Sequence, residues 1–519
     1  MTTIPKIPTF ILTRLSTPVQ ANLFTVQIAA LVVTIIVIAA FVLRFDDRPY
    51  PGLEIVGKEG KTTMGAKWHF LKAAPSIIYE TAKKTLHPYQ VIALGGPLII
   101  LPADSMEDLR KDERMTFKAF LEKMFFTHYP GFNGFRSVSD SDIMINSIKQ
   151  GLTQSLVASI VNLDVETAKA LQELFPATDE WRETCFDEMG VEIIARLSSR
   201  TFLPEPLCYN KQWLEIAAKY TLDFHMGAFS LRMVPPALRP IAYWFIPYTW
   251  KLRAQVRLAR KLINPYIDAR RAEQQKAMKE GRPPQKVSDA LQWIDNAAKG
   301  ENCDVVAALL GYTLAAVHTT SVTLVNCFYE LLSHPEYINE LREEVITVFK
   351  EEGAWTKPSL TKLRLMDSFM KESQRTSPVT LIPINRVAVE NFTLPDGTKV
   401  PKGATLGLPV TKMKDGTVFE NPEEFDGYRF YKMRQQPGNE QKWQFVSTSN
   451  EHVSFGHGKH ACPGRFFASN EIKIILAHLL TKYEWKLKDG KRPKVVSIGT
   501  EFMTNPDSKI LYRSRVSEI

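Results

Sequence analysis

Cysteine is scarce in this chain of 519 residues, which contains only five cysteines. They are widely separated, at Cys185, Cys208, Cys303, Cys327 and Cys462. An odd and scattered set argues against a disulfide framework and favours a reducing compartment. We therefore expect the folded body of the protein to face the cytosol.

Compact runs of basic charge are also absent. The chain carries 65 Lys and Arg against 56 Asp and Glu, a formal net charge of +9. Without a basic cluster, this excess does not mark a nucleic-acid site. An ordinary solvated surface accounts for it, as would contact with an anionic membrane or an acidic protein. We expect no nucleic-acid partner.

One long hydrophobic run, 23–43, has no formal charge and would span ~30 Å as a helix. It predicts a transmembrane helix, since a cleaved signal peptide would have a shorter apolar region ending in small residues. Basic residues are more numerous after the run than before it, which orients the body toward the cytoplasm. The expected organisation is a short segment 1–22, the helix 23–43, a proline-containing linker 44–56 and one large domain 57–519.

The most informative stretch is 453–468, which contains Cys462. Its glycines permit a tight loop that brings Cys462 to the start of a helix, where free backbone N–H groups would stabilise a thiolate. Three interpretations are open: a buried structural thiol, a zinc site and a thiolate ligand of haem iron. Zinc would draw on His452, His457 and His460, but their spacing fits no paired template.

Two further segments carry polar groups in apolar or helical surroundings. The stretch 305–329 contains no Asp, Glu, Lys or Arg but several hydroxyl side chains, which suits a helix buried inside a large domain. A threonine there, such as Thr319, more often bonds its own helix. Glu372 and Arg375 stand at i and i+3, where helical side chains can pair.

The pattern Phe455-x-x-Gly458-x-His460-x-Cys462-x-Gly464 resembles the haem-binding signature of the cytochrome P450 family. The resemblance implies that Cys462 is the axial ligand of a haem iron and a catalytic group. It also implies that Phe455, Gly458, His460 and Gly464 form the haem-binding loop. His460 stands where the family usually has an arginine that reaches a haem propionate.

Two other motifs are similar to segments of the same family, in the same order. Residues 315–320 resemble the oxygen-activating segment, which implies catalytic roles for Thr319 and His318, although Ala316 replaces the usual glycine and His318 the usual acid. Glu372, Arg375 and Arg429 resemble the charge network that shapes the haem-binding lobe.

Two arginines are expected to contact the haem propionates, Arg386 in the strand region and Arg465 after the cysteine. The Trp-x-x-x-Arg pair that serves this purpose in most family members is not found. The resemblance implies a mainly helical P450 fold with a small β-rich lobe, built from strands near 89–102, 384–410 and 483–513. The haem would lie between the 305–329 helix and the Cys462 loop.

The implied activity is haem-dependent monooxygenation with electrons from NADPH through cytochrome P450 reductase, with cytochrome b5 as an optional second partner. The resemblance to fungal members implies an endoplasmic reticulum membrane protein that oxidises a bulky lipophilic molecule such as a terpenoid, meroterpenoid or indole-diterpene. A fatty-acid or xenobiotic hydroxylase, a haem-thiolate isomerase or dehydratase, and a non-catalytic haem binder remain alternatives. The segment 128–140 is expected to be a loop. Two interpretations are open for the aromatic residues of 243–250, a membrane interface and core packing between two helices; these residues are Tyr243, Trp244, Phe245, Tyr248 and Trp250.

Overall fold

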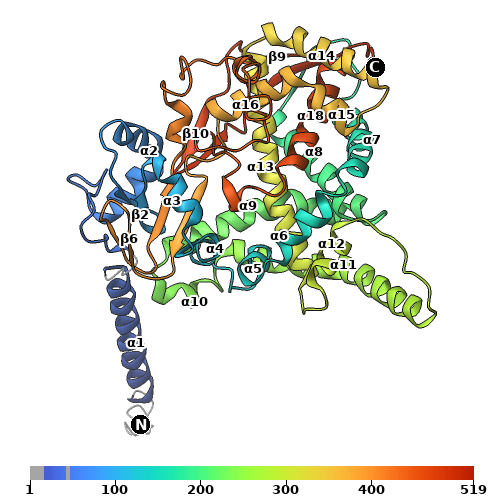
Figure 1. Ribbon diagram of the computed structural model, residues 1–519. Coiled ribbons are helices and arrows are strands. Elements are labelled where there is room, and N and C mark those ends of the chain that lie inside the picture. Colours follow the sequence, from blue (N-terminus) through green and yellow to red (C-terminus); the bar gives the residue numbers. More distant parts are fainter. Residues whose placement is uncertain (1–16, 43–46) are drawn as a thin grey trace, which may run out of the picture.

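Helix α13 (Val305–Ser333) runs through the middle of the helical body, and the other helices pack around it (Figure 1). The structure, a computed structural model, describes residues 17–42 and 47–519. The Asp304 side chain caps α13 by accepting a hydrogen bond of 3.0 Å from the Ala307 N–H. The helix ends at His334 before Pro335, which cannot continue it. The predicted buried helix is thus confirmed.

Glycines let α5 (Asn133–Asp140) approach α13 closely. A Cβ on Gly311 would lie 2.5 Å from the Gly134 carbonyl oxygen, so any larger residue there would force the helices apart. The expectation of a loop over 128–140 was therefore wrong in part. The segment lacks apolar periodicity because backbone contact at glycine, and not a stripe of large side chains, holds this helix in place.

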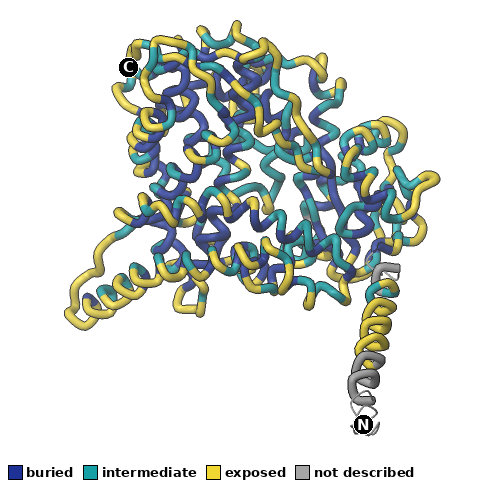
Figure 2. Tube along the Cα trace, turned by 180° about the vertical axis from the view of Figure 1, so that it is seen from behind, coloured by how far each residue is buried: buried dark blue, intermediate teal, exposed yellow. Residues whose placement is uncertain are grey.

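The remaining helices of the body surround this centre (Figure 2 shows the buried interior). They are α2 (Thr63–Ala82), α3 (Met106–Lys111), α4 (Phe117–Phe125), α6 (Ile143–Ser147), α7 (Leu156–Leu174), α8 (Phe186–Phe202), α9 (Lys211–Met233), α10 (Arg239–Ala242), α11 (Pro247–Lys279), α12 (Ala290–Ala298), α14 (Glu336–Glu352), α15 (Lys357–Lys362), α16 (Arg364–Thr376), α17 (Arg429–Arg434) and α18 (Arg465–Lys482). One π-helical turn, η3 (Ile148–Leu152), follows α6.

The β-rich lobe contains a five-stranded sheet in the order β1-β2-β8-β5-β3. Its strands are β1 (Tyr89–Ala93), β2 (Gly96–Ile100), β8 (Thr405–Leu408), β5 (Ile384–Ala388) and β3 (Met115–Thr116). The antiparallel hairpin of β1 and β2 confirms the predicted turn, where Gly96 adopts a φ of 107°. Three smaller sheets join β4 (Arg182–Thr184), β12 (Ile510–Ser514) and β9 (Tyr483–Leu487), β10 (Val495–Ile498) and β11 (Glu501–Thr504), and β6 (Phe392–Thr393) and β7 (Lys399–Val400).

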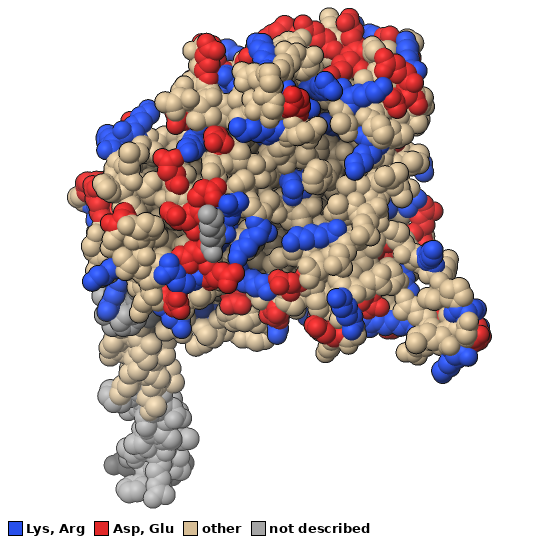
Figure 3. All heavy atoms as spheres, viewed as in Figure 1, with Lys and Arg blue, Asp and Glu red and all other residues tan. Residues whose placement is uncertain are grey.

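Helix α1 (Thr17–Val42) projects from the body, and its described portion carries no charged side chain (Figures 1 and 3). Among the described residues, the helix that is both long and apolar enough to span a membrane is α13, which is mostly buried. The apolar stretch Thr25–Ala39 of α1 is shorter. The expected segment 1–22, and the start of the linker 44–56, lie partly outside the described residues. Residues 47–56 pack on β1, since the Tyr50 and Val56 N–H groups bond to Gln90.

Candidate active site: a cysteine loop and an open face of α13

The loop before α18 is held by its own backbone. The Cys462 N–H donates to the Phe455 carbonyl at 2.7 Å. Gly456 and Gly458 adopt φ angles of 69° and 67°, which other residues rarely adopt. A Cβ on Gly458 would also lie 2.5 Å from the side chain of Arg110, which packs over the loop from α3. Both glycines are thus required by the shape of the loop.

Cys462 lies just before α18, which begins at Arg465 with Gly464 as its N-cap. Burial raises the pKa of the Cys462 thiol, while the backbone N–H groups of Gly464 and Arg465 and the Arg465 charge act in the opposite direction. A thiolate here therefore needs further positive charge, which a coordinated metal ion would supply.

The histidines near Cys462 do not converge on it. His452 is buried and its Nε2 lies 3.4 Å from the Lys371 carbonyl, while His457 Nδ1 bonds to Thr448 at 3.1 Å. Within the described ranges, no group of three or more His, Cys, Asp or Glu side chains could hold a metal ion. The zinc alternative consequently has no ligand set among these residues.

Positive charge is concentrated around His460. Burial, together with the charges of Arg386, Lys459 and Lys149, lowers the pKa of His460 to about 4. Burial also lowers the pKa of Arg386 to about 10, and its Nε has no hydrogen-bond partner among the described residues. Such a cluster suits an acidic group such as a haem propionate.

Arg465 is placed differently from Arg386. Its guanidinium donates to the carbonyl oxygens of Val446 and Cys462, at 3.1 and 2.7 Å. It thus braces the cysteine loop through the backbone. Sequence reasoning missed Arg110 and Lys149, which come from segments far from the motif. Lys149 lies in a π-helical turn, a geometry frequent at functional sites, but this turn becomes visible only in the structure.

Helix α13 is buried on most sides but open along one stripe. Ala315 and Thr319, one turn apart, are exposed within it. The Thr319 hydroxyl donates to the Ala315 carbonyl at 2.7 Å, and the Thr323 hydroxyl to the Thr319 carbonyl at 2.8 Å. His318 is half-buried, and its ring faces that of His225 on α9. A helix that is otherwise core thus presents small and hydroxyl side chains to an open space.

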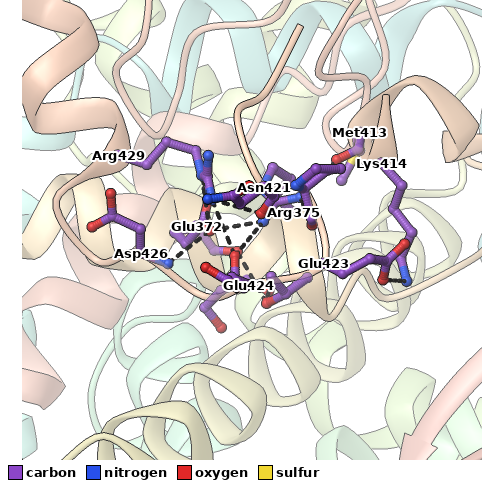
Figure 4. Close-up of polar contacts among 12 residues, drawn as sticks. Glu372, Arg375, Met413, Lys414, Asn421, Glu423, Glu424, Asp426 and Arg429 are labelled. Atoms are coloured by element: carbon purple, nitrogen blue, oxygen red, sulfur yellow. Dashed lines mark hydrogen bonds and ion pairs between the residues drawn. The ribbon is translucent and has the colours of Figure 1, made fainter. Parts of the chain in front are cut away.

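The structure brings Glu372, Arg375 and Arg429 together in a buried network (Figure 4). Both Glu372 oxygens accept bonds of 2.8 Å from Arg375, and Arg429 Nε lies 3.1 Å from each of them. The remaining guanidinium hydrogens of the two arginines point to backbone carbonyls of the segment 413–424. The network therefore fixes the path of the chain leading from the β-rich lobe to α17.

The residues present fit a haem with a thiolate ligand. Cys462 offers the sulfur of a half-buried residue, supported by two backbone N–H groups. Arg386 has an unpartnered Nε in a cluster of cations, which suits the two carboxylates of haem. The fold and this donor set define the class of haem-thiolate proteins.

Comparison with known proteins identifies the family. The model of the family "Cytochrome P450" matches residues 213–512. The cytochrome P450 monooxygenase easM of Aspergillus fumigatus is 40% identical over 428 residues, covering 82% of both chains. The cytochrome P450 monooxygenase bsc2 of Alternaria brassicicola is 35% identical over 504 residues, covering 96% of both. The chain belongs to the cytochrome P450 family.

Family membership carries several general properties. The protein has the P450 fold and is a haem-dependent monooxygenase whose cofactor is a haem with a thiolate ligand. Enzymes of this family receive their electrons from redox partners such as a reductase, and fungal members are generally associated with membranes.

Proposed function

We propose that this enzyme hydroxylates, or oxidises in successive steps, a bulky lipophilic substrate such as a terpenoid, meroterpenoid or indole-diterpene of fungal secondary metabolism. The observation that carries the proposal is the uncharged open stripe on α13, the helix that α18 contacts directly after the Cys462 loop. When bound, a haem thiolate supplies the activation of molecular oxygen and the transfer of one oxygen atom to carbon.

In this proposal Cys462 holds the haem iron through its sulfur. Phe455, Gly458 and Gly464 shape the backbone around that sulfur: the Phe455 carbonyl accepts the Cys462 N–H, and Gly458 has a positive φ of 67°. His460 and Arg386 hold the haem propionates, and Arg465 supports the same loop by bonding the Cys462 carbonyl.

Thr319 is the proposed proton-delivery group. Its Oγ1 now donates to the Ala315 carbonyl, so it retains lone pairs that can accept a hydrogen bond from water in the open space. If the hydroxyl gives up its bond to the Ala315 carbonyl, it can donate its own proton into the open space beside α13 and take a replacement proton from the water. His318, next to Thr319, would help to order this water.

The expected substrate is apolar over most of its surface. Ala315, Ala316, Val379, Phe502 and Met503 are uncharged and at least partly accessible. Two other residues considered for this role, Leu381 and Ile382, are buried in the core of the β-rich lobe. A long fatty acid or a xenobiotic would suit the same apolar lining.

We also propose that α1 anchors the enzyme as a single span in the endoplasmic reticulum membrane with the body in the cytosol, where NADPH–cytochrome P450 reductase and cytochrome b5 can reach it. Ile241, Trp244, Phe245 and Trp250 are exposed near the turn η5 (Pro236–Leu238) that α1 contacts. Tyr243, in contrast, is buried and bonds the Pro130 carbonyl, so it belongs to the core.

Cys462→Ala tests the central assignment. The reduced carbon monoxide complex of the native protein should show the red-shifted Soret band of thiolate ligation, and the variant should lose it. Cys208→Ala, which removes a buried cysteine outside this loop, is the control and should keep the band. An unchanged spectrum in Cys462→Ala would refute the assignment.

A second experiment addresses the substrate. Metabolite profiling of a strain that lacks the gene should reveal an accumulated polycyclic precursor. The purified enzyme with reductase should then consume O₂ and NADPH when given this compound. If only the hydroxylated fatty acids change, the proposed substrate class is wrong and the enzyme is a fatty-acid hydroxylase.

A further inference from the structure

Two histidines from different helices face each other beside the open stripe of α13. The rings of His225 on α9 and His318 on α13 have centroids 6.1 Å apart and an interplanar angle of 38°. Both residues are half-buried, so part of each side chain or backbone is still accessible. His318 directly precedes Thr319, which places the pair at the proposed site of oxidation.

The hydrogen-bonding character of His225 is set by its own helix. Its Nδ1 lies 2.8 Å from the Thr221 carbonyl, which can only accept, so Nδ1 carries the hydrogen. Burial lowers the pKa of His225 to about 4, and the ring is neutral at pH 7. Its Nε2 therefore presents a lone pair, which requires a donor.

His318 offers the complementary group. Burial lowers its pKa, so it is also neutral, and no hydrogen bond of its ring is found among the described residues. A neutral imidazole carries one N–H and one lone pair, and either nitrogen of His318 can take the hydrogen. His318 can thus donate where His225 accepts.

Among the described residues no hydrogen bond joins the two rings, whose centroids are 6.1 Å apart. This centroid separation leaves room for one oxygen atom between the rings that accepts or donates a hydrogen bond of about 2.8 Å to a nitrogen of each. A hydroxyl satisfies both rings because it donates and accepts, whereas a ketone would turn a lone pair toward the His225 Nε2.

The surroundings favour a neutral ligand with one polar group. Phe125 and Phe224 contact the His225 ring at centroid distances of 5.6 and 5.9 Å. The charge of Arg232, which is itself attracted to Glu501 on β11, also disfavours a protonated His225. The two imidazoles are therefore neutral polar groups that lie beside the aromatic rings of Phe125 and Phe224.

We propose that His225 and His318 together bind a hydroxyl group of the substrate, so that the enzyme acts on an apolar polycyclic skeleton that already bears an alcohol. This inference rests on the proposed function and narrows its substrate class. It also implies that an earlier reaction, which installs or retains a hydroxyl group, precedes this oxidation.

The test uses the haem-loaded enzyme and matched probes on decalin, perhydrophenanthrene and androstane skeletons, each as alcohol, ketone and deoxy form. Binding is measured by the spin-state absorbance change and by calorimetry. At least one alcohol should bind about tenfold more tightly than its ketone and deoxy counterparts, as expected for a hydrogen-bonded polar group in an apolar site.

Variants assign that preference to the pair. In His225→Phe and in His318→Phe the alcohol should bind within about twofold of its deoxy form, while His318→Gln, which keeps an N–H donor, should retain part of the preference. His334→Phe is the control, since His334 lies ~24 Å further along α13 by helical rise and stacks on Phe425.

Each outcome decides the inference. A panel in which no alcohol exceeds its counterparts overturns it, as does a preference that survives both phenylalanine substitutions. If the same preparation shows the thiolate band with carbon monoxide, only this inference falls. If that band is missing from the native enzyme, the proposed function falls and the inference falls with it.

Discussion

Buried polar groups are paired in one region of this enzyme and left open in another. At the junction of α16 and α17, Glu372 receives two arginines and the Asp426 N–H, and it has no exposed surface. Beside the Cys462 loop and on α13, Arg386 has an unpartnered Nε and the His318 ring makes no hydrogen bond among the described residues. Glu372, whose hydrogen-bonding groups are all satisfied, has a structural role. At Arg386 and His318, where hydrogen-bonding groups are left unsatisfied, we expect a ligand.

The largest effect is expected at the paired site. Glu372→Ala leaves Arg375 and Arg429 buried without their carboxylate, which should lower the free energy of unfolding by ~3–5 kcal/mol. We expect haem-free or insoluble protein, measured as haem content per chain and by denaturant unfolding. Glu423→Ala, which removes an exposed carboxylate paired with Lys414, should have little effect. Normal haem content in Glu372→Ala would show that the paired network is not needed to shape the haem-binding lobe.

Glu471 on α18 provides an internal contrast to Glu372. It is equally buried, but its one hydrogen bond comes from Ser198, and burial raises its pKa to about 8. The folded state thus holds a proton that the unfolded state releases above about pH 4.5, so stability should fall as the pH rises toward 8, by about 1.4 kcal/mol per unit. Glu471→Gln should flatten this dependence in unfolding curves recorded between pH 5 and 8. An unchanged slope would mean that Glu471 is ionised in the folded protein.

A substitution of Arg386 tests whether the unpaired groups beside the Cys462 loop bind haem, and haem retention is the measured property. Arg386→Gln removes a charge that we assign to a propionate, so haem should transfer to apomyoglobin about tenfold faster, consistent with the loss of a charge-assisted hydrogen bond. Lys459→Gln is the control for net charge, because Lys459 is exposed and paired with Glu113. Equal rates in the two variants would show that Arg386 acts only through long-range charge.

Thr319→Ala should change stability least and function selectively. The lost hydroxyl bonds its own helix, so the free energy of unfolding should change by less than about 1 kcal/mol. Turnover should become uncoupled, with NADPH oxidised and peroxide released in place of product. Thr323→Ala removes the same kind of bond one turn further along and should remain coupled. Coupled turnover in Thr319→Ala would leave the hydroxyl with a structural role alone.

Local sequence patterns predicted many elements because they depend on neighbouring residues. The absence of charge over 305–329 predicted the buried helix α13, and the Gly-Gly-Pro turn predicted the β1–β2 hairpin. The loop expected over 128–140 contains α5 instead, because the fit between Gly134 and Gly311 joins residues far apart in the chain. For Tyr243 the sequence left both a membrane interface and core packing open, and contact with Tyr129 and Pro130 places it in the core.

The sequence by itself was enough to identify the family and to single out Cys462 as the expected haem ligand. The spacing of residues along the chain decides which of them share one loop or one helical turn. Only the tertiary structure decided how distant side chains meet. It brought Lys149 and Arg386 to His460, and it placed Arg110 over Gly458. It also set His225 opposite His318, a relation between two helices that no local periodicity records. Contacts of this kind depend on how whole helices pack against one another, and this packing depends on how all the side chains of the core fit together.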